Sequence, residues 1–555
     1  MKAPSHMTHG MEGATQLELD SQRLDRDQSE RFPRVAGIAA PAWYLEIGLD
    51  RGPVIGCFRR VRSMLDRHER GTPMAFRDMR DLMAVLEQRG KLRRVAKPVE
   101  RDWELACMAR WMFQGLDEAD RFGLLFENIE GFETAVATGV IGSSREAYAI
   151  ALGVEPDDIN DKWVEALCNP LVPRTGETAL CQEVVTTGAD VDLDRIPIPV
   201  WTPGKDAAPY ISCPVITRDA DSGVYNVGVY RTMVVDGRTV VINLGPGRHG
   251  MRCVQSYLDR GEPAPIAWVV GAEPVVNIAA VANVPYGTDE LAVAGGLAGE
   301  PVELVRARTI DLLVPATAEY VIEAEIRPGD IAEEGPFGEF AGFMNDAMLK
   351  RPVAHVTAIT HRRDPIYYGF ISQMPPSEST TLQSISYAGL ISKMLRHDLG
   401  HENVRDVHVD LTFGGQMAHG TIALKPRHPR QAKQIGRLVA DATTLKRVTV
   451  VDDDIDIRDP MHMAWAMNSR FNPAKDTVII DDTFAPGTMD PTLEVIDGVT
   501  EPSSKIVCDA TQKRGRGAYS LPSMELMNRA LESWTEAGLP AFKVPKRATS
   551  MLEQS

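Results

Sequence analysis

Residues 224–244 read VYNVGVYRTMVVDGRTVVINL, and this stretch indicates how the middle of the chain folds. Two runs rich in valine and other strand-forming residues flank Asp236-Gly237. Asp-Gly favours a tight hairpin turn because both residues tolerate a positive φ. We therefore expect a β-hairpin with strands at Val224–Val235 and Arg238–Leu244, inside a mostly β region.

Helix and strand patterns alternate on both sides of this β region, which predicts α/β domains. On the N-terminal side, Met79, Leu82, Met83 and Leu86 have the spacing of an amphipathic helix that ends near Gly90. On the C-terminal side we expect strands at 420–424, 447–451 and 477–480, and helices at 429–438 and 461–469.

At 555 residues the chain is too long for one core. The proline-rich segment 196–203 (IPIPVWTP) is typical of a domain boundary, and the polar residues before 35 lack periodicity. We expect a mixed α/β (α+β) protein with these parts: a disordered or peripheral extension at 1–73, an N-terminal α/β domain at 75–195, a central β-rich domain at 196–345, a C-terminal α/β oligomerisation domain at 346–530, and a tail at 531–555.

Composition excludes several classes of function. The formal net charge is −17 and the pI about 5.3, whereas binding to nucleic acid or an anionic membrane needs a basic surface. The seven cysteines form no Cys-x-x-Cys pair, and no run of 18 apolar residues occurs in the sequence. We expect a cytoplasmic protein with no nucleic-acid or membrane partner.

Residues 333–339 (EEGPFGE) place three carboxylates around a Gly-Pro turn. Proline has a fixed φ and no N–H, so a helix cannot continue through this segment. The turn can bring Glu334 and Glu339 towards one point, and paired carboxylates shift each other's pKa values apart, which suits acid–base catalysis. Taken alone, such a segment is more often an acidic surface turn.

Residues 245–250 (GPGRHG) match the G-x-G-x-x-G pattern of dinucleotide-binding loops, and Glu273 lies near the position of a ribose-binding acid. However, the strand before the loop belongs to the expected hairpin, whereas a dinucleotide fold needs a βαβ crossover. The helix expected at 251–258 is also short. We interpret the segment as a glycine-rich loop or a loop that presents His249, with a nicotinamide oxidoreductase as the alternative.

Asn226, His249 and Glu290 offer an amide oxygen, an imidazole and a carboxylate, which suit Mg²⁺ or Mn²⁺. On spacing alone, His249 is more often an ordinary loop residue. Arg231 lies five residues after Asn226, so on a regular strand these two side chains point to opposite faces, one towards a metal and one towards a substrate anion. An exposed strand cation is the alternative for Arg231.

The run Asp452–Asp456 (DDDID) follows an expected strand and has the composition of a magnesium or phosphotransfer cluster. It does not fit an EF-hand, because glycine is missing at the sixth position and Met463 stands at the twelfth. Acidic residues are common in loops that follow parallel strands. We therefore interpret this run as ordinary loop residues.

Taken in order, four segments resemble the UbiD family of decarboxylases, which use prenylated FMN. They are 225–231 (YNVGVYR), the Gly-Arg-His loop ending at His249, 285–290 (PYGTDE) with 294–297 (AGGL), and 334–339 (EGPFGE). Residues 450–470 and 504–510 also look like the family's C-terminal domain. The resemblance covers about residues 75–515, and the order and spacing of the motifs are together specific.

By this resemblance the central domain is a split-barrel that binds prenylated FMN with Mn²⁺ or Mg²⁺, and K⁺ often lies nearby. The metal ligands would be Asn226, His249 and Glu290. Residues expected at the cofactor are Asn226, Arg231, Arg248, His249, Glu290 and Lys446, the last at the phosphate. The stretch 278–282 (IAAVA) lacks the Ser or Thr of many members, and Arg248 replaces the glutamine of some ferulic-acid-type members, which argues against a cinnamate-like substrate.

The resemblance also implies the reaction. Loss of CO₂ from an sp² carbon needs an electron sink, which the family's cofactor provides and no side chain does. Arg231, Glu334 and Glu339 correspond to the family's Glu-Arg-Glu catalytic network. We expect Arg231 to orient the substrate carboxylate and keep Glu334 ionised. Glu339, less well paired and with a raised pKa, would then protonate the substrate carbon.

The expected function is reversible, non-oxidative decarboxylation of an aromatic, heteroaromatic or α,β-unsaturated carboxylic acid by a homodimer or hexamer. A separate flavin prenyltransferase would supply the cofactor, and residues 374–386 would contribute to the pocket. The alternatives are an NAD(P)-dependent oxidoreductase that uses Gly245–Gly250, and a non-catalytic UbiD-like subunit. The intact set of Arg231, Glu334 and Glu339 argues against the last alternative.

Overall fold

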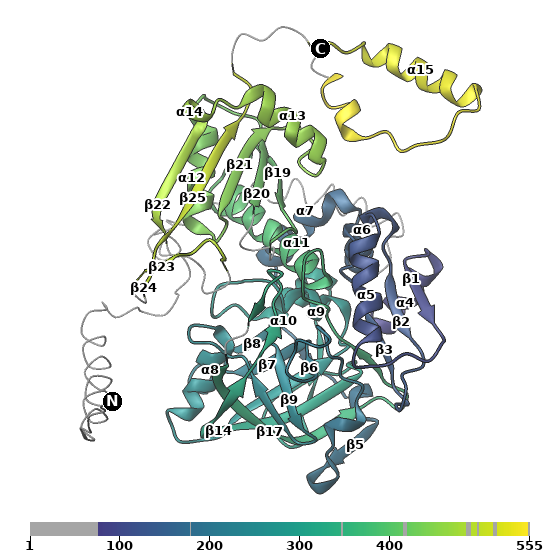
Figure 1. Cartoon of the computed structure of the whole chain (residues 1–555), viewed down its shortest axis with the longest axis vertical. Coiled ribbons are helices and arrows are strands. Elements are labelled where there is room, and N and C mark those ends of the chain that lie inside the picture. Colours follow the sequence, from purple (N-terminus) through teal and green to yellow (C-terminus); the bar gives the residue numbers. More distant parts are fainter. Residues whose placement is uncertain are drawn as a thin grey trace, which may run out of the picture. The chain divides into compact units, whose positions relative to one another are not determined.

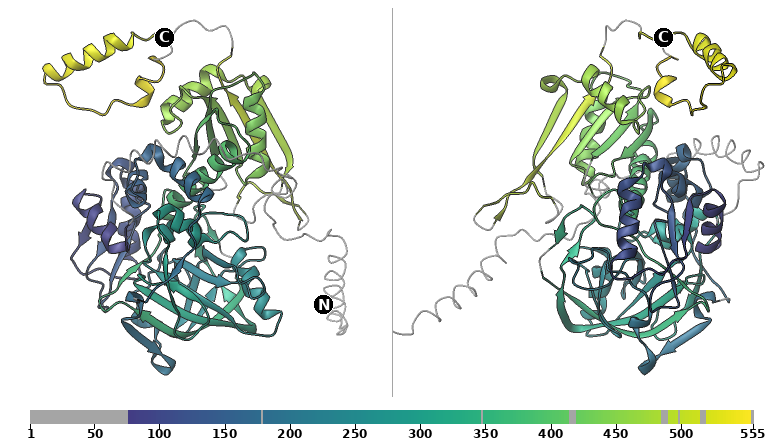
Figure 2. Two further views of the ribbon diagram at one scale, coloured as in Figure 1. Left: turned by 180° about the vertical axis from the view of Figure 1, so that it is seen from behind. Right: turned by 45° about the vertical axis from the view of Figure 1, so that its right-hand side comes forward.

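The computed structural model describes residues 76–552, except 178, 346–347, 414–418, 484–489, 497–498 and 514–518. The expected extension at 1–73 lies outside the described residues. Three large sheets with their helices confirm the mixed α/β fold (Figures 1 and 2). Among the described residues, no helix is both long and apolar enough to cross a membrane.

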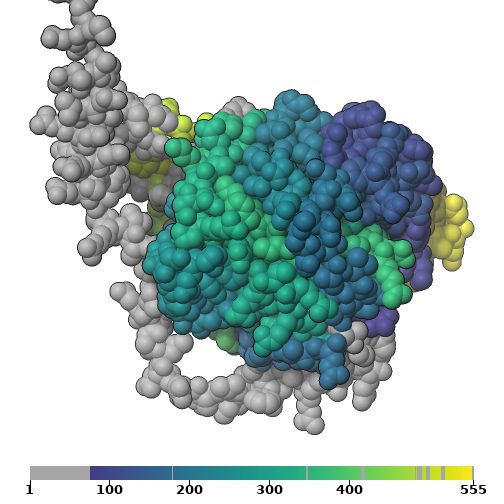
Figure 3. Space-filling view, turned by 90° about the horizontal axis from the view of Figure 1, so that it is seen from below, coloured from purple at the N-terminus to yellow at the C-terminus, as the bar shows by residue number. Residues whose placement is uncertain are grey.

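The N-terminal part of the described chain contains a four-stranded sheet and four helices. Helix α4 (Met79–Gln88) buries Met79, Leu82, Met83 and Leu86, as their spacing predicts. The other helices are α5 (Glu104–Gly115), α6 (Arg145–Leu152) and α7 (Ile159–Cys168). The strand order is β1 (Leu92–Val95), β2 (Gly123–Phe126), β3 (Ala135–Thr138) and β18 (Ile366–Tyr368). Strand β18 comes from far along the chain and pairs in parallel with β3. Figure 3 shows the chain as a space-filling view, in which the first described residues are purple.

The central part is built on an antiparallel sheet. Its strand order is β6 (Tyr210–Ile211), β9 (Thr232–Asp236), β10 (Thr239–Ile242), β17 (Leu349–His361), β14 (Tyr320–Glu334), β11 (Ala264–Val270), β7 (Pro214–Arg218) and β8 (Tyr225–Val229). Strand β5 (Val184–Thr187) pairs with β17, so the sheet extends beyond the expected limits of 196–345 at both ends. Helices α8 (His249–Leu258), α9 (Pro274–Ala279) and α10 (Glu290–Ala298) belong to this part. Small sheets add β4 (Arg174–Thr175), β12 (Glu303–Arg306) and β13 (Leu313–Pro315), and β15 (Phe337–Gly338) with β16 (Met344–Asn345).

The expected single strand Val224–Val235 is wrong, because the chain breaks at Tyr230 and Arg231 into β8 and β9. These two strands lie towards opposite ends of the sheet order, yet three Cα–Cα steps join them, a span of at most about 11 Å. The sheet must therefore curl until its two ends approach each other, which is the expected split-barrel. Arg231 lies at this seam.

The C-terminal part is a five-stranded mixed sheet with helices. Its strand order is β19 (Val404–Val409), β20 (His419–Leu424), β21 (Arg447–Asp452), β25 (Ser503–Ala510) and β22 (Thr477–Thr483). Helices α12 (Gln431–Ala442), α13 (Pro460–Arg470) and α14 (Pro473–Asp476) connect them, and β23 (Val495–Ile496) pairs with β24 (Val499–Thr500). All strands and helices expected in this part are present. Helix α11 (Glu378–Lys393) packs on α7 and β19, and α15 (Met524–Glu536) crosses the expected limit at 530.

Candidate active site

Arg231 forms a fork with two glutamates of the acidic turn. Its Nε and Nη2 donate to Oε1 and Oε2 of Glu334 at 2.8 and 2.9 Å, and Nη1 donates to Oε1 of Glu339. The Glu334 side chain is fully buried, and only 8% of the Arg231 side chain is exposed. The turn thus brings both predicted carboxylates to one arginine at the barrel seam.

The turn is shaped by glycine and by its neighbours. Gly335 has a φ of 112°, a conformation that side chains with a Cβ rarely adopt. The Gly338 N–H donates to Asp206 Oδ1 at 2.8 Å, and the guanidinium of Arg231 lies 5.0 Å from the ring of Phe337. Glu333 is exposed.

Glu339 differs from Glu334 because it faces a cavity of about 400 Å³. Besides Arg231, its carboxylate accepts one weak hydrogen bond, from Asn345 Nδ2 at 3.4 Å. Residues of four segments line the cavity: Ala106, Cys107 and Arg110; Trp201, Thr202, Pro203 and Lys205; Gly338, Glu339, Gly342, Phe343 and Met344; Gln373 and Met374. Of the segment 374–386, expected to contribute to the pocket, Met374 is in this set.

Asn226 and Glu290 form a second buried cluster. Asn226 Nδ2 donates to Glu290 Oε1 at 3.1 Å, and the Val227 N–H donates to Oε2 at 3.0 Å. Burial raises the pKa of Glu290 to about 8, because only neutral N–H groups compensate its charge. The hydroxyl of Tyr230 donates to Asn226 Oδ1 at 3.0 Å.

His249 begins helix α8, and the next residue, Gly250, is linked to this cluster through Tyr230. The N–H of Gly250 donates to the Tyr230 hydroxyl at 3.1 Å. Burial, then the charges of Arg252 and Arg248, lower the pKa of His249, which favours the neutral imidazole that binds metals. Arg248 itself is exposed.

The donor set fits a hard divalent cation. A buried carboxylate, an amide oxygen and a neutral imidazole are ligands of Mg²⁺ and Mn²⁺, and a cation would compensate the charge of Glu290. Within the described ranges, no group of three His, Cys, Asp or Glu residues could hold a metal ion. A divalent site on these residues therefore depends on the amide of Asn226.

Lys446 is not brought to these clusters by any contact of the described residues. Its Nζ donates to both carboxylate oxygens of Asp490, at 2.8 and 3.1 Å, and to Thr492 in the C-terminal part. The side chain is 38% exposed. The expected contact of Lys446 with the cofactor phosphate stays a prediction.

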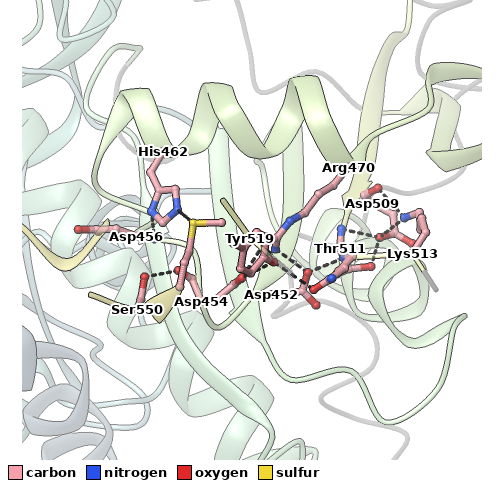
Figure 4. A network of polar contacts seen from close by, with 12 residues as sticks. Asp452, Asp454, Asp456, His462, Arg470, Asp509, Thr511, Lys513, Tyr519 and Ser550 are labelled. Carbon is pink, nitrogen blue, oxygen red and sulfur yellow. Dashed lines mark hydrogen bonds and ion pairs between the residues drawn. The ribbon is translucent and has the colours of Figure 1, made fainter. Parts of the chain in front are cut away.

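The aspartate run, interpreted from the sequence as ordinary loop residues, forms an ion-pair cluster with Arg470 (Figure 4). The fully buried Arg470 of α13 donates from Nη1 to Asp452 and Asp454 at 2.8 Å and from Nη2 to Asp454 at 2.6 Å. The hydroxyl of Tyr519 accepts from Arg470 Nη2 and donates to Asp454 Oδ2. These carboxylates hold α13 on the sheet.

The glycine loop does not belong to a dinucleotide fold. Strand β10 before it pairs antiparallel with β9 and β17, so the βαβ crossover is missing, as expected. Glu273 is buried and accepts from Thr317 Oγ1 at 2.7 Å, so it is not available to a ribose. Burial raises the pKa of Glu273 to about 7.

This buried acid gives a prediction about stability. Between about pH 4.5 and 7 folded Glu273 keeps a proton that the unfolded chain loses, so its contribution to stability falls as pH rises. At pH 8, Glu273→Gln is therefore expected to have a free energy of unfolding higher than that of the parent by up to about 3 kcal/mol, and so to unfold at a higher urea concentration. Near pH 4.5 this difference should disappear. Urea unfolding at several pH values measures the difference.

Glu323→Gln is a matched control. That buried carboxylate accepts from the N–H groups of Arg308 and Thr309 at 2.8 and 2.7 Å, so its substitution should destabilise the protein instead. A difference between Glu273→Gln and the parent that does not change with pH would contradict the prediction.

Two residues of the site, Tyr230 and Arg110, were not predicted from the sequence. Tyr230, which links Asn226 to helix α8, stands next to Arg231 and resembles any strand tyrosine. Arg110 resembles an ordinary helix cation. Its distinguishing mark is that no acidic residue stands three or four positions away, where a helix cation usually finds a partner.

Family models match most of the described chain. They are the N-terminal, Rift-related and C-terminal domains of 3-octaprenyl-4-hydroxybenzoate carboxy-lyase, at residues 83–167, 174–375 and 380–510. The chain belongs to the UbiD family of carboxy-lyases.

Solved structures of UbiD-class enzymes are similar over their whole length. HmfF from Pelotomaculum thermopropionicum, in complex with FMN, is 32% identical with a TM-score of 0.72, over 82% of this chain and 99% of that one. An evolved dimeric form of HmfF in complex with prFMN is also 32% identical, with a TM-score of 0.70 over 81% and 98%. Vanillic acid decarboxylase of Sedimentibacter hydroxybenzoicus is 27% identical with a TM-score of 0.72, over 84% and 100%.

Proposed function

We propose that this protein is a reversible, non-oxidative decarboxylase of an aromatic, heteroaromatic or α,β-unsaturated carboxylic acid that uses prenylated FMN. The observation that carries the proposal is the fork of Arg231. It holds Glu334 and Glu339 together, while only Glu339 of these three lines the cavity. Two carboxylates with one cation between them, and with unequal access to a ligand, can divide into an orienting member and a proton donor.

The roles follow from the contacts. Three of the five N–H groups of Arg231 bind the glutamates, which leaves two that can orient a substrate carboxylate. Glu334 holds the guanidinium in place. Glu339 donates a proton to the substrate carbon once CO₂ has left. The bound prenylated FMN supplies the electron sink for the carbanion equivalent.

We propose that Asn226, His249 and Glu290 hold Mn²⁺ or Mg²⁺, with K⁺ nearby, and that the metal binds the cofactor phosphate. The contact between Asn226 and Glu290 and the lowered pKa of His249 support this. Arg248 is exposed next to His249 and can contribute charge to a phosphate at the start of α8.

The experiment that tests the function is a screen for CO₂ release. The chain is co-expressed with a flavin prenyltransferase, purified with its cofactor, and supplied with aromatic, heteroaromatic and acrylic acids. Release of CO₂ from at least one acid, and exchange of labelled CO₂ into it, is expected. Binding of NAD(P)H without flavin absorbance would favour the oxidoreductase, and bound flavin without CO₂ exchange would favour the non-catalytic subunit.

We also propose a cytoplasmic homodimer or hexamer. All residues of α15 are outside the protein core, and its apolar side chains Leu526, Met527, Leu531 and Trp534 are exposed. A second copy of the chain would cover them. Light scattering of the intact protein should give a mass of two or six chains, and a monomer would contradict the proposal.

A further inference from the structure

Arg110 is a cation in the wall of the cavity that has no counter-ion among the described residues. It lies on α5, and its Nη1 and Nη2 donate to the carbonyl of Met374 at 2.7 Å and to Gln373 Oε1 at 3.4 Å. Both acceptors are neutral, and in the described part of the chain no carboxylate forms an ion pair with it. Burial lowers the pKa of Arg110 to about 10, so it stays charged at neutral pH.

The charge of the cavity wall supports an anionic ligand. Arg110, Lys205 and Glu339 are its charged residues, and Glu339 is already paired with Arg231. Lys205 is exposed and forms no ion pair with a described residue. The wall therefore has an excess of positive charge. A partly buried cation of this kind is costly unless a ligand pairs with it.

We propose that Arg110 binds a second carboxylate of the substrate, so that the preferred substrates are dicarboxylic acids that lose one carboxylate and keep the other. The inference rests on the proposed function for the carboxylate that is lost. Two of the five N–H groups of Arg110 are used by Gln373 and Met374, which leaves three for a planar, bidentate partner. A cavity of about 400 Å³ is within the size range of small-molecule sites.

The test compares acids that differ only in the second carboxylate. Benzoate with terephthalate, pyrrole-2-carboxylate with pyrrole-2,5-dicarboxylate, and cinnamate with 4-carboxycinnamate are titrated into the holoenzyme by calorimetry, and kcat/KM is measured where turnover occurs. At least one diacid should bind roughly 10- to 100-fold more tightly than its monoacid. Arg110→Gln should remove this preference and leave monoacid binding within about threefold of the parent.

Two further variants separate recognition from folding. Arg110→Lys keeps the charge without the planar fork and should keep part of the preference. Arg93→Gln removes an exposed cation of β1 outside the cavity and should change nothing.

The inference would be overturned if the parent binds no diacid better than its monoacid. It would also be overturned if Arg110→Gln weakens the binding of diacid and monoacid equally, because loss of the contacts with Gln373 and Met374 alone would have that effect. A preference for 4-hydroxybenzoate over benzoate without one for any diacid would also count against it. Because binding can be measured for acids that are not turned over, failure of the inference differs from failure of the proposed function, in which no acid releases CO₂.

Discussion

Glu339→Gln is expected to lower the rate of decarboxylation by at least about 1,000-fold while the protein keeps its flavin. Glutamine has the size of glutamate, and its carbonyl oxygen can still accept from Arg231 Nη1, so the fork should persist. It has no acidic proton to give to the substrate carbon. The loss should therefore appear in kcat, with flavin absorbance and the melting temperature close to those of the parent.

Three measurements distinguish proton donation from a structural role. In the decarboxylated product, the hydrogen that has replaced CO₂ should exchange with deuterium from solvent, and this exchange should disappear together with CO₂ release in Glu339→Gln. Glu333→Gln, at the exposed neighbour in the same turn, should keep full activity. Glu334→Gln removes the charged partner of a buried arginine, so it should lower stability as well as rate. Near-parental decarboxylation by Glu339→Gln would exclude it as the proton donor.

The sequence predicted the elements of the fold well where local patterns decide them. The helix through Met79 and Leu86 and the alternating elements after 418 form as expected, because a continuous apolar face specifies each one. The strand expected through Tyr230 and Arg231 does not form. The closure of the barrel, a tertiary effect, overrides the strand propensity of residues 224–235.

In the candidate site, too, local sequence patterns predicted some of the geometry and tertiary structure decided the rest. A Gly-Pro turn between acidic residues predicts that Glu334 and Glu339 can converge, and both contact Arg231. The expectation that Asn226 and Arg231 face opposite sides assumed a regular strand. In the structure the chain breaks after Val229, and the two side chains belong to separate clusters.

Sequence patterns did not predict contacts between remote segments. Arg110 reaches Met374 across 264 positions of the chain, and no local rule connects a helix cation to that loop. The pairing of Lys446 with Asp490 is likewise decided by the C-terminal sheet. Residues of this kind are recognised only when their partners in space are known.

His249→Ala is expected to remove the metal and the flavin together. The imidazole is the nitrogen ligand of the proposed set, and its loss should weaken metal binding more than about 100-fold. Loss of a residue that only hydrogen-bonds to a metal ligand costs less, about 10- to 100-fold in metal affinity. If the metal binds the cofactor phosphate, flavin absorbance should fall in proportion to the metal content determined by mass spectrometry. Glu290→Gln should have the same effect, because it removes the anionic ligand.

The control for this prediction is His355→Ala. His355 lies on β17 and pairs through Nε2 with Asp330 at 2.7 Å, and its side chain is partly exposed, so metal and flavin should both stay at parental levels. A His249→Ala protein that loses metal but keeps flavin would show that the two bind independently. One that keeps both would remove His249 from the ligand set. Joint loss in His249→Ala, with both retained in His355→Ala, is the outcome expected of a metal shared between the protein and the phosphate.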